Sequence, residues 1–328
     1  MGTVAVLLGL LALAAGCGTV GKPTQGGPNS SPAGQQNGTK VVRIGYQKFG
    51  TFAILKAKGA LEKRLAALGY SVEWALFPGG PQLLEAMNAG SIDIGHTGDA
   101  PPIFAQAAGG PLVYVATTPP SPASEAILVK ADSPIRNVED LKGKKVALNK
   151  GSNVHYFLVK ALASAGLQPA DIQPVYLPPA DARPAFERGR VDAWAIWDPF
   201  YAAAQQAGGV RVLVDGKGLV ANREFFLATQ TFVKEHPDLL SLLLEELNNV
   251  SQWARENPRG VAALLAPELG MDTATVEQAA KRRAYGVEPL VEHVVAEQQH
   301  IADTFYQIGL VGKPIRVRDA VFSSMSTH

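Results

Sequence analysis

The chain has 328 residues, of which 47% are hydrophobic and 18% charged, a composition typical of a globular protein. Its formal net charge is +1 and it has no basic or acidic block, which argues against a nucleic-acid-binding protein. The length is enough for two lobes of roughly 100–150 residues each.

The N-terminus is typical of a secreted protein. The apolar run from Val4 to Ala15 is shorter than the about 20 residues that span a bilayer, but it suits a signal peptide. It ends at Leu-Ala-Ala-Gly-Cys, which resembles the processing site of bacterial lipoproteins, where the Cys is lipidated. Cys17 is the only cysteine, so it can form neither an internal disulfide nor a structural zinc site. We therefore predict a lipoprotein signal over residues 1–17, with an ordinary secretion signal as the alternative.

Residues 18–40 consist mostly of Gly, Pro, Ser, Gln, Asn and Thr, with almost no apolar side chain. Such a segment buries too little surface to offset its ordering entropy. We expect a flexible tether between the membrane and the folded part.

From residue 41 onward the pattern alternates between strands and helices, as in an α/β fold with parallel strands. The first block predicts strands over 41–45, 72–77, 92–95 and 112–117, and helices over 51–68, 81–89 and 101–108. After a Pro-rich crossing at 118–122, the second block predicts strands over 145–148, 175–177, 193–196 and 210–214, and helices over 153–165, 181–188 and 199–207. Amphipathic helices over 239–256, 259–265, 272–282 and 288–309 follow, and we expect them to pack on the first lobe.

An internal repeat links the two blocks. Residues 90–101 align without a gap with residues 189–200, at the offset of 99 between Gly90 and Gly189. Both stretches read Gly, any residue, a β-branched residue and Asp, with a second Asp six residues later. A weaker echo relates residues 43–48 to residues 145–150. The repeat predicts two similar lobes, 41–118 plus 219–328 and 119–218, that face each other across a ligand cleft.

The loops after the predicted strands have the composition of a ligand site. In open α/β sheets, ligands bind beyond the carboxyl ends of the strands, where helices begin. Glycines there allow close approach of the backbone, and several converging helix N-termini make an anion site without Arg. The Ser, Asn and Asp residues could also be simple helix caps, a role compatible with binding. The candidate ligand-binding residues are Gln47, Phe49, Gly80, Pro81, Gln82, Thr97, Gly98, Asp99, Gly151, Ser152, Asn153, Trp197 and Asp198.

Side-chain alternation separates two of the aromatic residues. Trp194 shares a strand face with Ile196 and is predicted to lie in the core, whereas Trp197 falls at the strand end and is predicted to line the cleft. Asp99 and Asp198 do not suit an anion site. We expect them to accept hydrogen bonds from loop N–H groups, or from a ligand amine.

These loops closely resemble those of the aliphatic sulfonate substrate-binding proteins of bacterial ABC importers. The resemblance rests on residues 44–48, 77–82, 97–107, 141–143, 150–152, 179–183 and 194–199. It implies an α/β, two-lobed type II periplasmic-binding-protein fold, in which each lobe is a mostly parallel sheet flanked by helices. It further implies a cleft that closes on an alkanesulfonate, for sulfur acquisition. The implied partners are a membrane permease and a separate ATPase.

From this resemblance and the N-terminus we expect a monomer without cofactor or metal, anchored by lipid in the periplasm or on the outer face of the cytoplasmic membrane. Taurine, nitrate or a thiamine precursor remain alternative ligands, because relatives bind them. Sensing is an alternative to transport. An enzyme is the other class, since desulfination enzymes use this fold with a Cys nucleophile. Here Cys17 precedes the folded part, and the chain has no Gly-x-Ser-x-Gly, His-Glu-x-x-His or Walker A motif, so we predict no enzyme.

Overall fold

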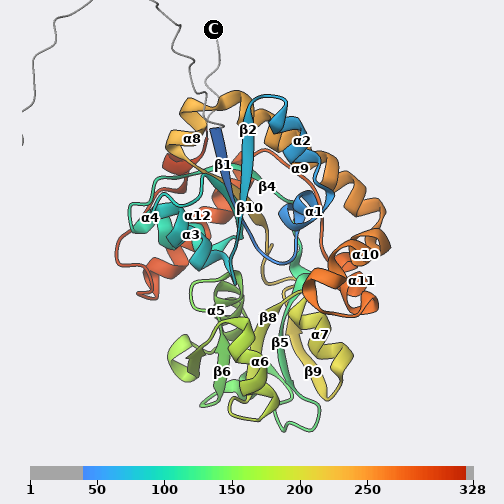
Figure 1. Ribbon diagram of the computed structural model, residues 1–328. Helices are drawn as coiled ribbons and strands as arrows, with labels where there is room; N and C mark the ends of the chain where they lie inside the picture. Colours follow the sequence, from blue (N-terminus) through green and yellow to red (C-terminus); the bar gives the residue numbers. More distant parts are fainter. Residues whose placement is uncertain (1–39, 323–328) are drawn as a thin grey trace, which may run out of the picture. The chain divides into compact units, whose positions relative to one another are not determined.

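Two five-stranded sheets organise the part of the chain that the computed structural model describes, residues 40–322 (Figure 1). The sheet of the first lobe has the order β2-β1-β3-β10-β4, and that of the second lobe has the order β7-β6-β8-β5-β9. The strands are β1 Lys40–Tyr46, β2 Tyr70–Leu76, β3 Ile94–Gly98, β4 Leu112–Thr117, β5 Glu125–Lys130, β6 Lys145–Leu148, β7 Gln173–Tyr176, β8 Ala193–Trp197, β9 Val210–Asp215 and β10 Glu224–Thr229.

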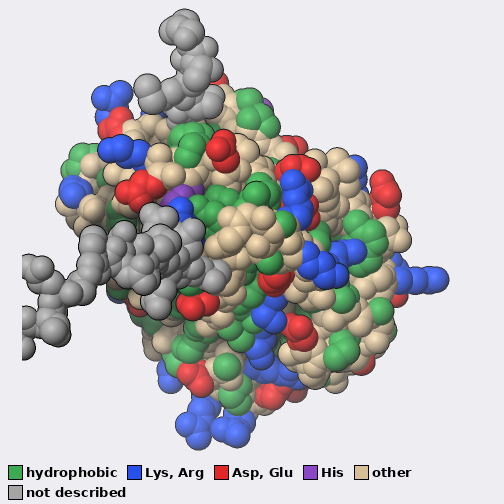
Figure 2. Space-filling view, turned by 45° about the horizontal axis from the view of Figure 1, so that its top comes forward, with side chains coloured by type: hydrophobic (Ala, Val, Ile, Leu, Met, Phe, Trp, Pro, Cys, Tyr) green, Lys and Arg blue, Asp and Glu red, His purple; other side chains and the backbone are tan. Residues whose placement is uncertain are grey.

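Helices cover the sheets, which confirms the predicted two-lobed α/β fold. Their bounds are α1 Thr51–Lys58, α2 Ala60–Ala66, α3 Gly80–Asn88, α4 Ala100–Ala107, α5 Asn153–Ser164, α6 Pro179–Glu187, α7 Phe200–Ala207, α8 Gln230–Glu235, α9 Pro237–Glu256, α10 Pro258–Leu269, α11 Thr273–Arg282 and α12 Glu292–Gln307. None of these helices is both long and apolar enough to cross a membrane. On the face shown in Figure 2, acidic and basic side chains are interspersed.

Each sheet contains one antiparallel strand, and both of these strands escaped the sequence prediction. β10 runs antiparallel to β3 and β4, and β5 runs antiparallel to β8 and β9. Each follows a segment in which the chain crosses from one lobe to the other. The single helix predicted over 51–68 is also wrong, because Gly59 has a left-handed φ of 62° and separates α1 from α2.

The sequence repeat corresponds to a structural repeat. In the first lobe the Asp93 carboxylate accepts the backbone N–H of Arg43 at 2.8 Å, and in the second lobe Asp192 accepts that of Lys145 at 2.8 Å. The glycine at the start of each copy, Gly90 or Gly189, has a φ of 71° or 66°, where a side chain would be strained. The repeated pattern is therefore a turn and a side chain that together hold β3 and β8 at equivalent places beside β1 and β6.

The C-terminal helices depart partly from the prediction that they pack on the first lobe. α9 and α10 pack on α1, and α12 packs on α4. α11, however, lies against α7 of the second lobe, where the Gln278 side-chain amide donates to Gln205 at 3.0 Å. The C-terminal helices therefore contact both lobes, with α11 on the second lobe and the others on the first. Their amphipathic pattern alone does not reveal this division.

Candidate functional site

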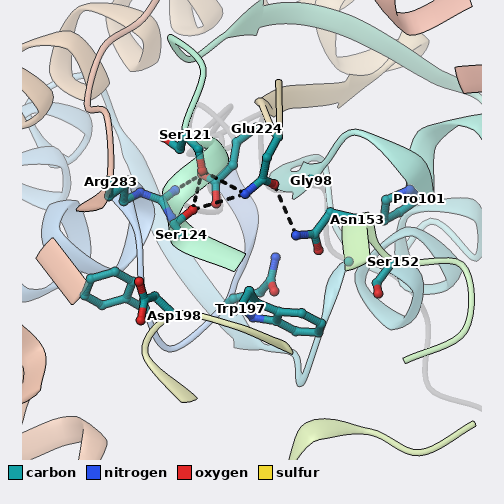
Figure 3. Close-up of a pocket in the computed structure, with 14 residues that line it drawn as sticks. Gly98, Pro101, Ser121, Ser124, Ser152, Asn153, Trp197, Asp198, Glu224 and Arg283 are labelled. Carbon is teal, nitrogen blue, oxygen red and sulfur yellow. Dashed lines mark hydrogen bonds and ion pairs between the residues drawn. The ribbon is translucent and has the colours of Figure 1, made fainter. Parts of the chain in front are cut away.

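The carboxyl ends of the parallel strands in both sheets enclose a small polar cavity, named here the polar cavity (Figure 3). Its volume is about 40 Å³, several times the about 10–15 Å³ that one water molecule needs. It is lined by Gln47, Phe49, Gly80, Gly98, Pro101, Ser121, Ser124, Ser152, Asn153, Trp197, Asp198, Asn222, Glu224 and Arg283.

Helix N-termini from both lobes point at this cavity. Gly80 begins α3, Pro101 lies in the first turn of α4, and Ser152 and Asn153 begin α5. Pro suits the first turn of a helix because the N–H that it lacks would have no intrahelical partner. The first N–H groups of each helix are unpaired and carry part of the positive end of the helix dipole. The cavity is therefore suited to an anion.

Glycine allows the two lobes to meet beside the cavity. A Cβ atom on Gly98 would lie 2.8 Å from the Cβ of Asn153 in the opposite lobe. A Cβ on Gly79 would lie 2.8 Å from the side-chain nitrogen of Asn149. Real Cβ contacts are not this short, so a larger residue at Gly98 would displace Asn153 of the opposite lobe, whereas one at Gly79 would require the flexible end of the Asn149 side chain to move.

The two crossing segments, residues 118–122 and 218–223, are joined beside the cavity by a polar network. The Asn153 amide donates to Glu125 Oε2 at 2.6 Å and to Asn222 Oδ1 at 3.1 Å. The Asn222 amide donates to the Ser121 carbonyl at 3.0 Å and to Ser124 Oγ at 3.1 Å. Burial raises the pKa of Glu125 well above its usual range, and the negative charge of Asp99 adds to this. The network thus links α5 of the second lobe to both crossings.

Two carboxylates and two arginines form the charged side of the site. Arg283 pairs with Glu224, and Arg282 lies 3.3 Å from Asp198 Oδ1. Burial would raise the pKa of Glu224, but Arg283 and His96 outweigh it and hold that pKa at about 2. Burial raises the pKa of Asp198 to about 6, against the attraction of Arg282.

An apolar cavity of about 320 Å³ adjoins the polar one and shares Gln47, Phe49, Trp197, Asp198, Glu224 and Arg283 with it. Its other walls come from Lys48, Leu76, Phe77, Pro78, Pro179, Ala180, Pro199 and Phe200. The two cavities together are amphipathic, with converging N–H groups at one end and mostly aliphatic and aromatic side chains at the other. This combination suits a ligand with an anionic head and an apolar tail.

Eight of the thirteen candidate residues line the polar cavity: Gln47, Phe49, Gly80, Gly98, Ser152, Asn153, Trp197 and Asp198. Trp194 is buried in the core, as predicted, with 1% of its surface exposed. Trp197 lines both cavities, as predicted. Asp198 accepts the backbone N–H of Ala202 at 3.0 Å, in the first turn of α7, so it acts at a helix start rather than toward a loop N–H.

The other five candidates lie elsewhere. Thr97 and Asp99 flank Gly98, and because successive residues of a strand point to opposite sides, neither lines the cavity that Gly98 lines. Thr97 is buried beneath Gly80, and Asp99 faces a separate cavity with Tyr156, Lys160 and Gln298. Among the described residues Asp99 Oδ1 accepts no hydrogen bond, although the backbone N–H groups of Ala100 and Asp99 lower the pKa of this carboxyl group. A third cavity is lined by Pro81, Gln82 and Gly151. The first two follow Gly80 in the chain and Gly151 precedes Ser152, and it is Gly80 and Ser152 that line the polar cavity.

Sequence reasoning missed five polar residues of the site: Ser121, Ser124, Asn222, Glu224 and Arg283. They lie in or beside the crossings, or just after α11, rather than after a parallel strand. One local signal existed at Ser121, which lies inside the Pro-rich crossing. Nothing in the sequence around Arg283 indicates that it reaches the cleft.

The fold and the cleft define the class of this protein: two α/β lobes, joined by crossing segments, with a cleft between them, an architecture in which hinge closure around a ligand is common. A family model described as NMT1/THI5 like matches residues 70–261. The solved alkanesulfonate-binding protein SsuA from Xanthomonas axonopodis pv. citri, bound to MOPS, is 43% identical with a TM-score of 0.83, over 86% of this chain and 98% of that one.

The periplasmic aliphatic sulphonate binding protein SsuA from Escherichia coli is 45% identical with a TM-score of 0.79, over 87% of this chain and 92% of that one. A taurine-binding periplasmic protein of Escherichia coli (strain K12) is 28% identical over 194 residues, which are 58% of this chain and 59% of that one. The chain therefore belongs to the NMT1/THI5-like family and, within it, to the aliphatic sulfonate-binding proteins.

Proposed function

We propose that this protein is the extracytoplasmic solute-binding component of an ABC importer and captures aliphatic sulfonates between its lobes. The observation that carries the proposal is the juxtaposition of the two cavities, one formed by helix N-termini and the other by apolar side chains. A relative with 43% identity was solved with MOPS, itself a sulfonate. Delivery to a membrane permease, powered by a separate ATPase, follows from membership of the family.

The chemistry of a sulfonate fits the polar cavity. A sulfonate is the anion of a strong acid, so it stays charged near neutral pH and requires no proton transfer from the site. Its three oxygens accept hydrogen bonds from many directions, which the backbone N–H groups at the starts of α3 and α5, those of Gly80 and Asn153, can supply. The alkyl tail then lies along Phe49 and Trp197 in the apolar cavity.

Thermal unfolding of the purified protein with a ligand panel tests this function. The panel holds ethane-, butane- and octanesulfonate, taurine, nitrate, sulfate and a thiamine precursor. A ligand present at about 100 times its dissociation constant stabilises the folded state by about 2.7 kcal/mol, a readable shift in Tm. Alkanesulfonates should give the largest shifts. A shift with nitrate or the thiamine precursor alone would preserve the class and overturn the substrate.

We further infer that the protein is a lipoprotein anchored at Cys17, with residues 18–40 as its tether. All of these residues except Lys40, which begins β1, lie outside the part that the structure describes, so the inference rests on the apolar run and the motif that ends at Cys17. Cys17→Ser should abolish metabolic labelling by a fatty acid and release the protein from the membrane fraction. Retention of both label and membrane association in Cys17→Ser would overturn the anchor.

A further inference from the structure

Two carboxylates line the polar cavity, one from each lobe. Asp198 follows β8 of the second lobe, and its side chain is 2% exposed. Glu224 begins β10 of the first lobe, and its side chain is 18% exposed. Left without partners, they would repel a sulfonate and attract an ammonium group.

Two adjacent arginines at the end of α11 neutralise these carboxylates, and each arginine pairs with one of them. Arg282 Nη1 lies 3.3 and 3.4 Å from the two Asp198 oxygens, and its guanidinium lies 3.9 Å above the ring of Tyr201. Arg283 pairs with Glu224, which also lies 3.2 Å from His96 Nδ1. The arginines can reach opposite lobes because α11 packs against α7 while the chain then turns back toward β10.

The result is a cavity without a free negative charge. Asp198 and Glu224 contribute two negative charges, and Arg282 and Arg283 contribute two positive charges. The helix ends that face the cavity are N-termini, which disfavour a cation. A ligand ammonium group would lose its hydration without gaining an unpaired carboxylate as acceptor.

We propose that Arg282 and Arg283 are specificity-determining residues that make the cleft select simple alkanesulfonates over taurine, in which a primary ammonium group lies two carbons from the sulfonate. The inference rests on the proposed function and deepens it, since both ligand classes carry the same head group. Loss of Arg282 would remove the counter-charge of Asp198. Because Arg282 also lowers the pKa of that carboxyl, the freed group would be ionised only in alkaline solution, where it would repel the sulfonate and accept a hydrogen bond from the amine. The cleft would change its preference without any change in its shape around the head group.

Ethanesulfonate and taurine, which differ only in the amino group, test this proposal by titration calorimetry at about pH 8.5, above the raised pKa of the Asp198 carboxyl. The wild-type protein should bind ethanesulfonate at least about tenfold more tightly than taurine, the equivalent of losing one hydrogen bond to a charged group. Arg282→Gln should bring the ratio of the two dissociation constants to about one or below, and Arg282→Lys should restore most of the wild-type preference. In the double variant Arg282→Gln with Asp198→Asn the preference should also return, because the freed carboxylate is gone.

Arg259→Gln is the matched control, since Arg259 forms an exposed pair with Glu277 on the far side of α11 and lines neither cavity. If Arg282→Gln does not fold, Asp198→Asn alone still tests the proposal. It leaves the positive charge of Arg282 without its carboxylate partner and should increase the preference for ethanesulfonate. Equal or tighter taurine binding by the wild type, or an unchanged ratio in Arg282→Gln, would overturn the inference. Absence of ethanesulfonate binding by the wild type would instead overturn the proposed function.

Discussion

Asp99 is an unusual residue in this structure, because its carboxyl group is buried at the start of α4 and its Oδ1 accepts no hydrogen bond within the described residues. Burial raises its pKa to about 7. Between about pH 4 and pH 7 the unfolded carboxyl group is ionised while the native one keeps its proton. The native state therefore binds more protons, and this group's contribution to stability falls as pH rises through that window.

Asp99→Asn should consequently stabilise the protein at pH 8, on the order of 2 kcal/mol, because an ionised carboxylate is no longer buried without a full set of partners. The difference between variant and wild type should shrink toward pH 4. Urea unfolding at several pH values measures both. Lys160, Arg223 and Glu297 line the same cavity and are present in both proteins. A difference that does not change with pH would contradict the assignment.

Trp197 is the residue expected to set the preference for tail length. It is half-buried at the end of β8 and lines both the polar and the apolar cavity. Trp197→Ala should weaken octanesulfonate binding by about tenfold, because apolar contact area is lost, and ethanesulfonate binding much less. Trp253→Ala, which removes an aromatic ring from α9 outside both cavities, should change neither. Equal losses for both ligands would show that Trp197 does not contact the tail.

At the scale of elements, the site depends on how closely helix N-termini and strand ends approach each other. Gly98 ends β3 directly opposite Asn153, which begins α5. The repeat places Gly98 and Trp197 at equivalent ends of β3 and β8, but only the first-lobe copy has a residue small enough for the other lobe to approach. The two lobes thus share an architecture and contribute different chemistry to the cleft.

Gly98→Val should weaken sulfonate binding by at least about tenfold with little loss of folding, since its side chain would occupy the space that Asn153 needs when the lobes meet. Gly312→Val is the matched control, because a Cβ there meets nothing within 4 Å and the backbone has no positive φ. Calorimetric titration with butanesulfonate, together with Tm of the unliganded proteins, separates binding from folding. Unchanged affinity in Gly98→Val would remove this contact from the closed site.

At the scale of the whole molecule, closure depends on the crossing segments that connect the lobes. Asn222, in the second crossing, forms hydrogen bonds with Ser121 of the first crossing and with Ser124, which follows it. It also accepts a hydrogen bond from Asn153 of α5. Its φ is 48°, a conformation that Asn tolerates better than most residues. Asn222 also lines the polar cavity and lies outside the apolar one, so its loss should affect every sulfonate alike, whatever the tail.

Asn222→Gly keeps the backbone conformation and removes the side-chain hydrogen bonds. It should weaken ethanesulfonate and octanesulfonate by the same factor, about tenfold, as expected for a smaller population of the closed state. Asn257→Gly, in the exposed loop before α10, should leave both affinities unchanged. Losses that differ with tail length would place Asn222 beside the tail and contradict a shared effect on all sulfonates.

The sequence by itself determined how the parallel strands and their helices follow one another along the chain. It also determined the internal repeat and most of the loops around the cleft. These features are local, because a strand or helix shows its period of two or 3.6 residues within a short window, and Gly, Pro and Asn mark the turns. Gly98, Ser152 and Trp197 were identified on this basis, since each lies where a strand ends or a helix begins.

The tertiary structure alone decided the antiparallel strands β5 and β10, the direction in which Thr97 and Asp99 point, and the arrival of Arg282 and Arg283 at the cleft. The physical reason is the sequence separation of the partners. Arg282 meets Asp198 across 84 residues, and no local pattern records which surface a helix end will reach. Such contacts form only when packed sheets and helices fix the positions of both partners, and the charge balance of the site depends on them.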